Sequence, residues 1–416
     1  MLKKLISFWR GELTKKVPLR TMLIVPFVVQ IFAMLGLVGY ISFLNGQQAV
    51  NDLATKLSDA VTARIELRVQ NYMELPHVFH QINTAAADNG NLDLADYDRL
   101  SRYFWQQVTG SEAVSSIYYG NAQGDFIGIQ QRPSGEIVAW LKDQALHPDR
   151  KTYLLDEQGN RLEEIANQEY DPTARPWYQA VAEAGRPTWS NIYRFASQDF
   201  DVLGITPAVP IYDGSGGLQG VLAIDLPLQQ ISDFLRELEI STNGEAFIIE
   251  RNGEIVASSV AEPPFVTADD GDVRLEAVNS TDPLIQASAQ HLQRSFGSFE
   301  LIGDGWQSTF ELGNERHFVQ VNGLQDGRGL DWLIVVVIPE GDFMGSINAN
   351  TRLTVIISMV AVALATLIGL TTYRWLVQPI LGLNNAAKAI AAGKWGERVA
   401  IDRGDELGEL AQSFNS

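Results

Sequence analysis

Two long stretches without a charged side chain constrain this sequence more than any other feature. No Asp, Glu, Lys or Arg occurs in residues 21–51 or in residues 353–373. Residues 21–44 and 353–373 are apolar for long enough to cross about 30 Å of hydrocarbon as a helix. The first stretch is too long for the core of a signal peptide and has no clear small-x-small site before Gln47, so it is read as an anchor. The sequence therefore predicts two transmembrane helices.

Charge predicts the orientation of these helices. Residues 1–20 form a basic tail with six Lys or Arg and a single acid, Glu12, whereas residues 45–350 hold 19 basic and 44 acidic side chains. Because basic flanks stay in the cytoplasm, both termini are predicted to be cytoplasmic. The acidic middle region is predicted to face the periplasm or the exterior, in a two-pass protein of the plasma (inner) membrane. The lipid bilayer is thus one partner, and the acidity argues against nucleic acid.

The exported region is predicted to start with a stalk helix at about residues 47–75. This segment has no Gly or Pro, and its apolar residues recur every three or four positions. These residues are Val50, Leu53, Leu57, Val61, Ile65 and Val69. Such a stripe can pack on its own domain, or it can form the stalk of a parallel homodimer that moves relative to the membrane. The sequence leaves both uses open.

A repeated pattern predicts two related domains, at about 76–238 and 239–348. Each half has an apolar hairpin signal with a Gly-containing turn, a loop-rich insert, a second hairpin and a closing helix. The paired segments are 116–130 and 246–258, then 205–226 and 318–338, then 229–238 and 342–348. This order describes two antiparallel sheets flanked by helices, which is an α+β fold class.

The longer first insert resembles a known family. Its segments YDPTARPWY (170–178) and GRPTWSNIY (185–193) precede GVLAIDLPL (220–228). At these residues the sequence is similar to the double Cache (dCache_1) sensor domains of bacterial, cyanobacterial-like sensor kinases, cyclases and chemoreceptors. The resemblance covers about residues 45–345, and it implies two PAS-like Cache domains on a long stalk helix. In this family the membrane-distal half holds the ligand, which places the expected pocket in the first insert.

The chemistry of the insert points to a binding site even without the family. The guanidinium of Arg175 can hold a carboxylate with two parallel hydrogen bonds, and aromatic rings around it exclude water. Asp225, at the end of an apolar strand, can accept hydrogen bonds from the ammonium group of a small zwitterion. The alternative is that Arg175 and Asp225 pair with each other or cap backbone groups, while Trp177, Tyr178 and Trp189 form ordinary core. The residues alone leave these alternatives open.

The resemblance implies a specific set of ligand-binding residues. Positions matching three of them contact the ligand carboxylate in amino-acid-binding members, and positions matching the other three line the pocket and its ammonium side. The first three are Tyr170, Arg175 and Trp177, and the others are Tyr178, Tyr193 and Asp225. Those members also have an aspartate where this chain has Phe195. The predicted ligand is therefore an amino acid or a small carboxylate, with Asp199 or Asp201 as substitutes if the loop folds back.

No residue pattern calls for a catalytic centre, a metal or a cofactor in this chain. The chain has no cysteine, which excludes disulfides and thiol chemistry. His77 and His80 have a spacing that can hold a metal, but Pro76 lies beside them and no third ligand accompanies them. Phosphate loops and HExxH motifs are also absent from the sequence.

The segment after the second apolar stretch, 374–416, resembles a HAMP linker. A proline follows the membrane in VQPI (377–380), two amphipathic helices are predicted, and DELG (405–408) opens the second. The resemblance implies a parallel helical coiled coil in a homodimer, which converts small helix motions into a packing change. The sequence ends at Ser416 in mid-helix, so an output domain is expected beyond it. A two-component histidine kinase is the favoured output, with a nucleotide cyclase, a chemoreceptor or a ligand-free partner-docking module as alternatives.

Overall fold

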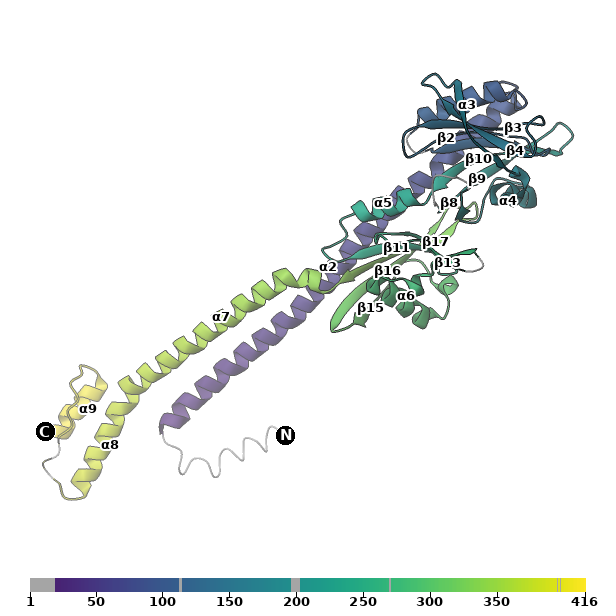
Figure 1. The fold of residues 1–416 in the computed structure, drawn as a ribbon. Helices are drawn as coiled ribbons and strands as arrows, with labels where there is room; N and C mark the ends of the chain where they lie inside the picture. The colour runs from purple at the N-terminus through teal and green to yellow at the C-terminus, as the bar shows by residue number, and fades with distance from the viewer. Residues whose placement is uncertain (1–18, 112–113, 196–202, 269–270, 395, 397) are drawn as a thin grey trace. The chain divides into compact units, whose positions relative to one another are not determined.

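The computed structural model describes residues 19–111, 114–195, 203–268, 271–394, 396 and 398–416. The chain divides into two compact units, one of residues 1–51 and 344–416 and the other of residues 52–343. The predicted basic tail, 1–20, lies almost wholly outside the described residues. Figure 1 labels the helices and strands of both units.

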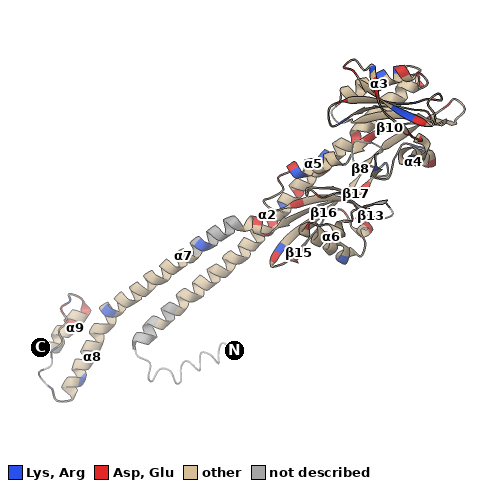
Figure 2. Ribbon diagram, viewed as in Figure 1, with Lys and Arg blue, Asp and Glu red and all other residues tan. Residues whose placement is uncertain are grey.

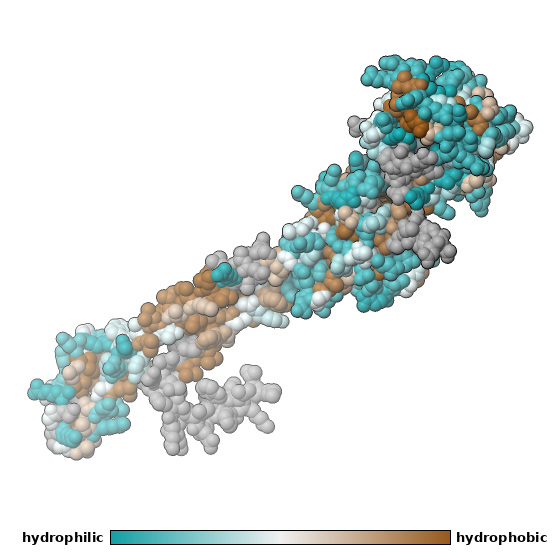
Figure 3. Space-filling view, in the orientation of Figure 1, coloured by the Kyte–Doolittle hydropathy of each residue, from teal (hydrophilic) through white to brown (hydrophobic). Residues whose placement is uncertain are grey.

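The first unit is helical. It contains the start of α2 (Leu19–Asp88), most of α7 (Gly341–Thr372), a π-helical turn η5 (Tyr373–Val377), α8 (Gln378–Ala391) and α9 (Glu406–Asn415). Two helical stretches are long and apolar enough to cross a membrane, one within Val29–Asp88 and one within Val355–Ala391. Between Arg352 and its end at Thr372, α7 carries no charged residue, and the helix is mostly tan in Figure 2. Figure 3 shows hydrophobic side chains gathered over it.

The exposed side chains of these helices include many large apolar ones, which are more stable in contact with lipid than with water. Phe32 and Leu37 are about 60% exposed on α2, as are Leu367 and Ile368 on α7. A contiguous apolar surface of this kind is rare on a soluble protein. Two candidate membrane helices therefore flank the region between them, as the sequence predicts.

The helices α8 and α9 share a small apolar core. Leu383 and Ala386 of α8 pack with Val399 of the connector and Ala411 of α9. The side chain of Asp405 accepts a hydrogen bond from the backbone N–H of Gly408 and so caps the start of α9. This is the pair of amphipathic helices that the sequence predicts.

The second unit contains the sheets, and all their strand pairs are antiparallel. The larger is a ten-stranded sheet in the order β5-β4-β3-β2-β1-β10-β8-β7, in which β9 pairs with β10 and β6 with β9. Its strands are β1 (Ser116–Asn121), β2 (Phe126–Gln131), β3 (Ile137–Lys142), β4 (Asp149–Leu155), β5 (Arg161–Glu169), β6 (Thr188–Trp189), β7 (Tyr193–Arg194), β8 (Leu203–Ile205), β9 (Pro207–Tyr212) and β10 (Leu218–Pro227). One face is covered by α2 and α3 (Tyr97–Thr109), around a core that includes Phe104, Ile117 and Leu222.

A five-stranded sheet in the order β12-β11-β17-β16-β15 forms the rest of the core, beside a small β13-β14 hairpin. Its strands are β11 (Glu245–Glu250), β12 (Ile255–Ser258), β15 (Trp306–Leu312), β16 (Glu315–Gln325) and β17 (Asp331–Pro339), and the hairpin is β13 (Phe265–Ala268) and β14 (Gly271–Arg274). One face packs on α2 and on α5 (Gln229–Glu237), and the other packs on α6 (Pro283–Phe296). The predicted α+β class with antiparallel sheets is confirmed.

Helix α2 extends further than the sequence predicts. The stalk helix was expected over 47–75, but α2 continues through Pro76 to Asp88. Proline removes one backbone hydrogen bond from a helix interior. Here Leu75 and Phe79 on either side of it pack into the core of the ten-stranded sheet, and this burial outweighs the loss.

The apolar stripe of α2 is largely occupied within its own unit. Val61, Ile65 and Val69 are buried against the core that also holds Trp332 and Leu228. Packing on the sensor's own sheets is therefore one use of the stripe. The homodimer stalk stays a prediction.

Candidate functional site

The candidate site lies on the face of the ten-stranded sheet that α4 (Pro176–Ala184) covers. Local sequence fixes the entry to this helix: Asp171 caps a short 3-10 turn, η2 (Pro172–Ala174), by accepting a hydrogen bond from the backbone N–H of Thr173. Pro176 occupies the start of α4 and disfavours helical backbone at the residue before it. Arg175 accordingly is extended, with φ −82° and ψ 148°, and separates the two helical turns.

Five of the six predicted residues line one small pocket. They are Tyr170, Arg175, Trp177, Tyr193 and Asp225. The sixth, Tyr178, does not line it: its ring packs edge-on against that of Trp177, with 5.5 Å between centroids. Tyr178 is the next residue of α4 after Trp177, and it contributes to the aromatic core behind the pocket.

Asp225 is the buried acid of the pocket. Its carboxylate accepts hydrogen bonds from the hydroxyl groups of Tyr118 at 2.5 Å, Thr206 at 2.7 Å and Ser116 at 3.1 Å. Burial raises the pKa of the carboxyl group, and these three hydrogen bonds and the positive charge of Arg175 oppose that rise. Asp225 does not form an ion pair with Arg175 within the salt-bridge distance, so the pairing alternative left open by the sequence is not what the described residues show.

Arg175 is half-buried at the pocket and has weak partners. Its Nη2 donates a long hydrogen bond of 3.4 Å to the carbonyl oxygen of Arg194, and its guanidinium lies 5.4 Å from the ring centroid of Tyr193. A guanidinium with this little competition keeps most of its donors available for a carboxylate.

A second arginine, Arg150 of β4, also lines the pocket and was missed from the sequence. Only 4% of this residue is exposed. Its guanidinium carbon lies 4.4 Å from the ring centroid of Tyr170 and 5.0 Å from that of Trp140. Burial lowers the pKa of the guanidinium. No sequence signal singles Arg150 out, because a strand pairing places it here rather than a local motif.

Aromatic side chains and one amide complete the wall. The remaining lining residues that the sequence did not predict as ligand contacts are Tyr118, Phe126, Gln130, Trp140 and Phe195. Phe126 packs on the rings of Tyr170 at 5.0 Å and Tyr118 at 5.5 Å between centroids. The space enclosed by the pocket is about 30 Å³, enough for one or two water molecules. Asp199 and Asp201, the proposed substitutes for an acid at Phe195, lie outside the described residues.

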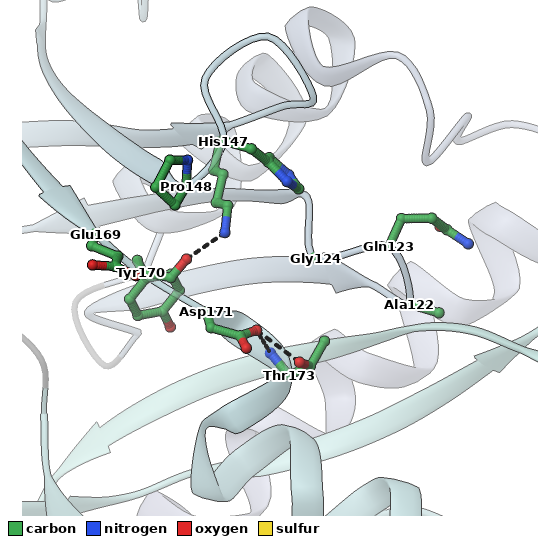
Figure 4. A pocket seen from close by; sticks show the side chains of 10 residues that line it. Ala122, Gln123, Gly124, His147, Pro148, Glu169, Tyr170, Asp171 and Thr173 are labelled. Carbon is green, nitrogen blue, oxygen red and sulfur yellow. Dashed lines mark hydrogen bonds between the residues drawn. The ribbon is translucent and has the colours of Figure 1, made fainter.

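A larger and more open cavity of about 410 Å³ lies beside this pocket and shares Tyr170 with it. Figure 4 shows His147, Glu169 and Asp171 around this cavity. Lys142 donates a hydrogen bond of 2.5 Å to the carbonyl oxygen of Tyr170, and the ring of His147 lies 3.0 Å from Asp125. Lys142, His147 and Asp171 of this cavity are thus already engaged in polar contacts, and aromatic rings do not enclose it as they enclose the Arg175 pocket.

His77 and His80 of α2 are the pair whose spacing can hold a metal but which the sequence analysis did not predict to be a metal site. His80 is buried with its Nε2 2.9 Å from the carbonyl oxygen of Pro207, and burial lowers its pKa to about 4. His77 packs edge-on against Trp189 at 5.0 Å between ring centroids. Over the described part of the chain, no group of three or more His, Cys, Asp or Glu residues is arranged to hold a metal ion.

These features define a class of protein: a sensor region with two antiparallel sheets, one of which encloses an arginine–aspartate pocket, flanked by two candidate membrane helices and a helical hairpin. Residues 47–347 match the dCache_1 family, described as Cache domain, and residues 371–416 match the HAMP domain. The chain belongs to the Cache-domain family and contains a HAMP domain.

Two curated relatives are bacterial chemotaxis proteins. The chain is 28% identical over 252 residues to the methyl-accepting chemotaxis protein PctB of Pseudomonas aeruginosa, which is 59% of this chain and 35% of the relative. It is 27% identical over 298 residues to the methyl-accepting chemotaxis protein McpA of Pseudomonas putida, 69% of this chain and 42% of the relative. The chain thus spans less than half the length of these relatives.

Among solved structures, the chain is similar to the ligand-binding domain of the Pseudomonas aeruginosa amino-acid chemoreceptor PctC in complex with GABA. The identity is 20% and the TM-score 0.43, covering 68% of this chain and 98% of that one.

Proposed function

We propose that this chain is the sensory part of a transmembrane receptor that binds a small extracellular molecule bearing a carboxylate, an amino acid or a small organic acid. The observation that carries the proposal is the pocket of the ten-stranded sheet, where Arg175 and Asp225 lie among buried aromatic rings. Such a site excludes water, which strengthens the contact between a guanidinium and a carboxylate.

The route of the signal is part of the same proposal. Ligand binding changes the packing around the pocket and biases the HAMP helices α8 and α9 by a coupling free energy of about 1–3 kcal/mol. The chain acts as a homodimer, because the apolar faces of HAMP helices are buried between two copies. The sensor faces the periplasm or exterior and both termini are cytoplasmic, as the basic residues near the N-terminus favour.

For the output, a chemotaxis receptor is better supported than the histidine kinase that the sequence favoured. Both PctB and McpA are named methyl-accepting chemotaxis proteins, and their matches cover 59% and 69% of this chain. We therefore place a methyl-accepting signalling domain after the HAMP helices of the intact protein. A nucleotide cyclase is the second candidate, because the chain is also 23% identical over 301 residues to an adenylate cyclase of Rhizobium meliloti.

The proposal predicts a large loss of ligand binding in Arg175→Ala. The variant leaves the ligand carboxylate without its charged donor, which costs about 2 kcal/mol, or more than tenfold in affinity. Arg175→Lys is expected to lose affinity as well, because an ammonium group cannot reproduce a two-pronged contact. Calorimetric titration of the full chain with a panel of amino acids and organic acids measures both.

Arg186→Ala is the matched control, since Arg186 belongs to the same insert but is exposed and does not line the pocket. It should bind like the parent chain. If a ligand is found and Arg175→Ala binds it as tightly as Arg186→Ala does, the proposed site is wrong.

A further inference from the structure

Arg150 is the most unusual charged group in the pocket. It is 4% exposed, it forms no ion pair within the described part of the chain, and its Nε has no hydrogen-bond partner there. Its guanidinium lies over the faces of two aromatic rings, Trp140 and Tyr170. Burying a cation without an anion is costly, and contact with ring faces offsets only part of that cost.

The pocket is lined by more positive than negative side chains, which indicates a role for Arg150 in binding an anion. Two guanidinium groups, Arg150 and Arg175, line it together with one carboxylate, Asp225. That carboxylate already accepts three hydrogen bonds from Ser116, Tyr118 and Thr206. The hydroxyl group of Tyr170 favours the charged form of Arg150, and that hydroxyl is neutral because burial raises its pKa. Arg150 forms no ion pair with another described residue, so the positive charge at its end of the pocket has no protein anion beside it.

We propose that the pocket binds a small molecule with two carboxylates, one held by Arg175 near Asp225 and the other held by Arg150 between Trp140 and Tyr170. This inference rests on the proposed function and specifies its ligand class. A ligand with a single carboxylate satisfies only one guanidinium and leaves the other buried and unpaired.

Ligand entry requires movement, because about 30 Å³ is too little room for any dicarboxylate. Arg175 can supply that room. It is half-buried, whereas Arg150 is buried, and its hydrogen bond to the carbonyl oxygen of Arg194 is long at 3.4 Å. A short dicarboxylate of three or four carbons requires the smallest displacement of the Arg175 side chain.

Four probes separate the second carboxylate from the ammonium group. Succinate has two carboxylates, L-aspartate has two and an ammonium, propionate has one, and L-alanine has one and an ammonium. Isothermal titration calorimetry on the full chain in detergent micelles should show succinate or L-aspartate, or both, binding at least tenfold tighter than propionate and L-alanine. The difference between succinate and L-aspartate reports whether Asp225 receives an ammonium group.

Arg150→Gln keeps a polar side chain but removes the charge. It should weaken binding of the dicarboxylates at least tenfold and change binding of the monocarboxylates less than twofold. Arg175→Gln should weaken all four probes, and the exposed Arg186→Gln should weaken none. If Arg150→Gln does not melt cooperatively, Arg150→Lys retains the charge and should keep the preference for dicarboxylates.

The outcomes separate the two proposals. Equal affinity for one and two carboxylates in the parent chain overturns the dicarboxylate inference while leaving the carboxylate receptor in place, as does unchanged succinate binding in Arg150→Gln. Undiminished binding in Arg175→Gln overturns the proposed function itself. Binding of none of the four probes at millimolar concentration overturns the dicarboxylate inference.

Discussion

The ten-stranded and five-stranded sheets of the sensor region contain an equivalent pair of strands, β1 with β10 and β11 with β17. The two pairs differ at the residues that would contact a ligand. In the larger sheet, β1 starts at Ser116, which lies opposite Asp225 of β10. In the smaller sheet, β11 starts at Glu245, which lies opposite Val337 of β17. Both second strands end alike, with Asp225 and Val337 each followed by an apolar residue and a proline.

The correspondence continues one step along the strands. Tyr118 pairs with Ala223 in the larger sheet, and Phe247 pairs with Val335 in the smaller one. Phe247, Val335 and Val337 are all buried in the core that α6 covers. The hydroxyl of Tyr118 that binds Asp225 thus has no counterpart on the Phe247 ring, and the acid itself is a valine.

The difference teaches that the pocket depends on few positions. An apolar frame of this kind packs shut when Phe and Val occupy the two positions, as in the smaller sheet. When Tyr and Asp occupy them, the buried acid needs hydrogen-bond donors, and Ser116, Tyr118 and Thr206 are buried with it to supply them. The following predictions exchange the residues between the two sheets.

The largest effect is expected from Val337→Asp in the smaller sheet. Val337 is fully buried, and the new carboxyl group would face Glu245 across the strand pair without the donors that surround Asp225. A buried, unpaired acid should cost about 3–5 kcal/mol of unfolding free energy. Chemical unfolding of the full chain, with hydrogen exchange of the β11 and β17 amides as the readout, measures this loss of unfolding free energy.

The control for this change is Val337→Thr, which keeps the branched shape and replaces one methyl group by a hydroxyl. It should cost about 1–2 kcal/mol. If Val337→Asp proves as stable as the threonine variant, a buried acid is tolerated in this frame without dedicated donors, and the comparison between the sheets loses its physical basis.

A smaller loss is expected from the reverse change, Asp225→Val. It removes the acceptor of three hydroxyl groups, and the shortest of these hydrogen bonds, 2.5 Å, comes from the buried Tyr118. Leaving that hydroxyl buried and unpaired should cost about 2 kcal/mol. Adding Tyr118→Phe should recover about 1 kcal/mol, since both partners are then apolar. Thermal melts of the two single variants and the double variant give the coupling, and a double variant less stable than Asp225→Val contradicts it.

Much of the fold was predictable because it follows from local pattern. The hairpin expected at 116–130 is formed by β1 and β2, and its turn contains Gly124 at φ +85°, a conformation that glycine adopts without strain. The passage of α2 through Pro76 was not predictable. It depends on Leu75 and Phe79 meeting a sheet that is distant in sequence.

The site was predictable to the extent that it is contiguous in sequence. Tyr170, Arg175 and Trp177 lie in one segment, and the resemblance names them together with Asp225. Arg150 was missed because it reaches the pocket through the pairing of β4 with β3 and β5, which no short motif records. Tyr178 was expected in the pocket but packs behind Trp177, since neighbouring residues of a helix point in different directions.

The smallest predicted effect concerns Glu245, which occupies the place of Ser116 in the smaller sheet. Burial, together with the neighbouring carboxylate of Asp282, which caps α6, raises the pKa of Glu245 to about 8. In the unfolded chain the pKa is 4.5. The folded state therefore holds a proton that the unfolded state releases, so stability is complete below about pH 4.5 and falls as the pH rises toward 8.

Glu245 is partly exposed, so solvent screening reduces this loss to about 1 kcal/mol. Glu245→Ser installs the residue of the larger sheet, and Glu245→Gln keeps the shape without a titrating group. Both variants should flatten the decline of unfolding free energy between pH 5 and 8 relative to the parent chain, with the glutamine variant the closer in absolute stability at low pH. Urea titrations at half-unit pH steps measure the decline. An equal decline of unfolding free energy in all three chains would assign the pH dependence to other groups. The carboxyl groups of Glu245 and Asp282 would then contribute nothing measurable to it.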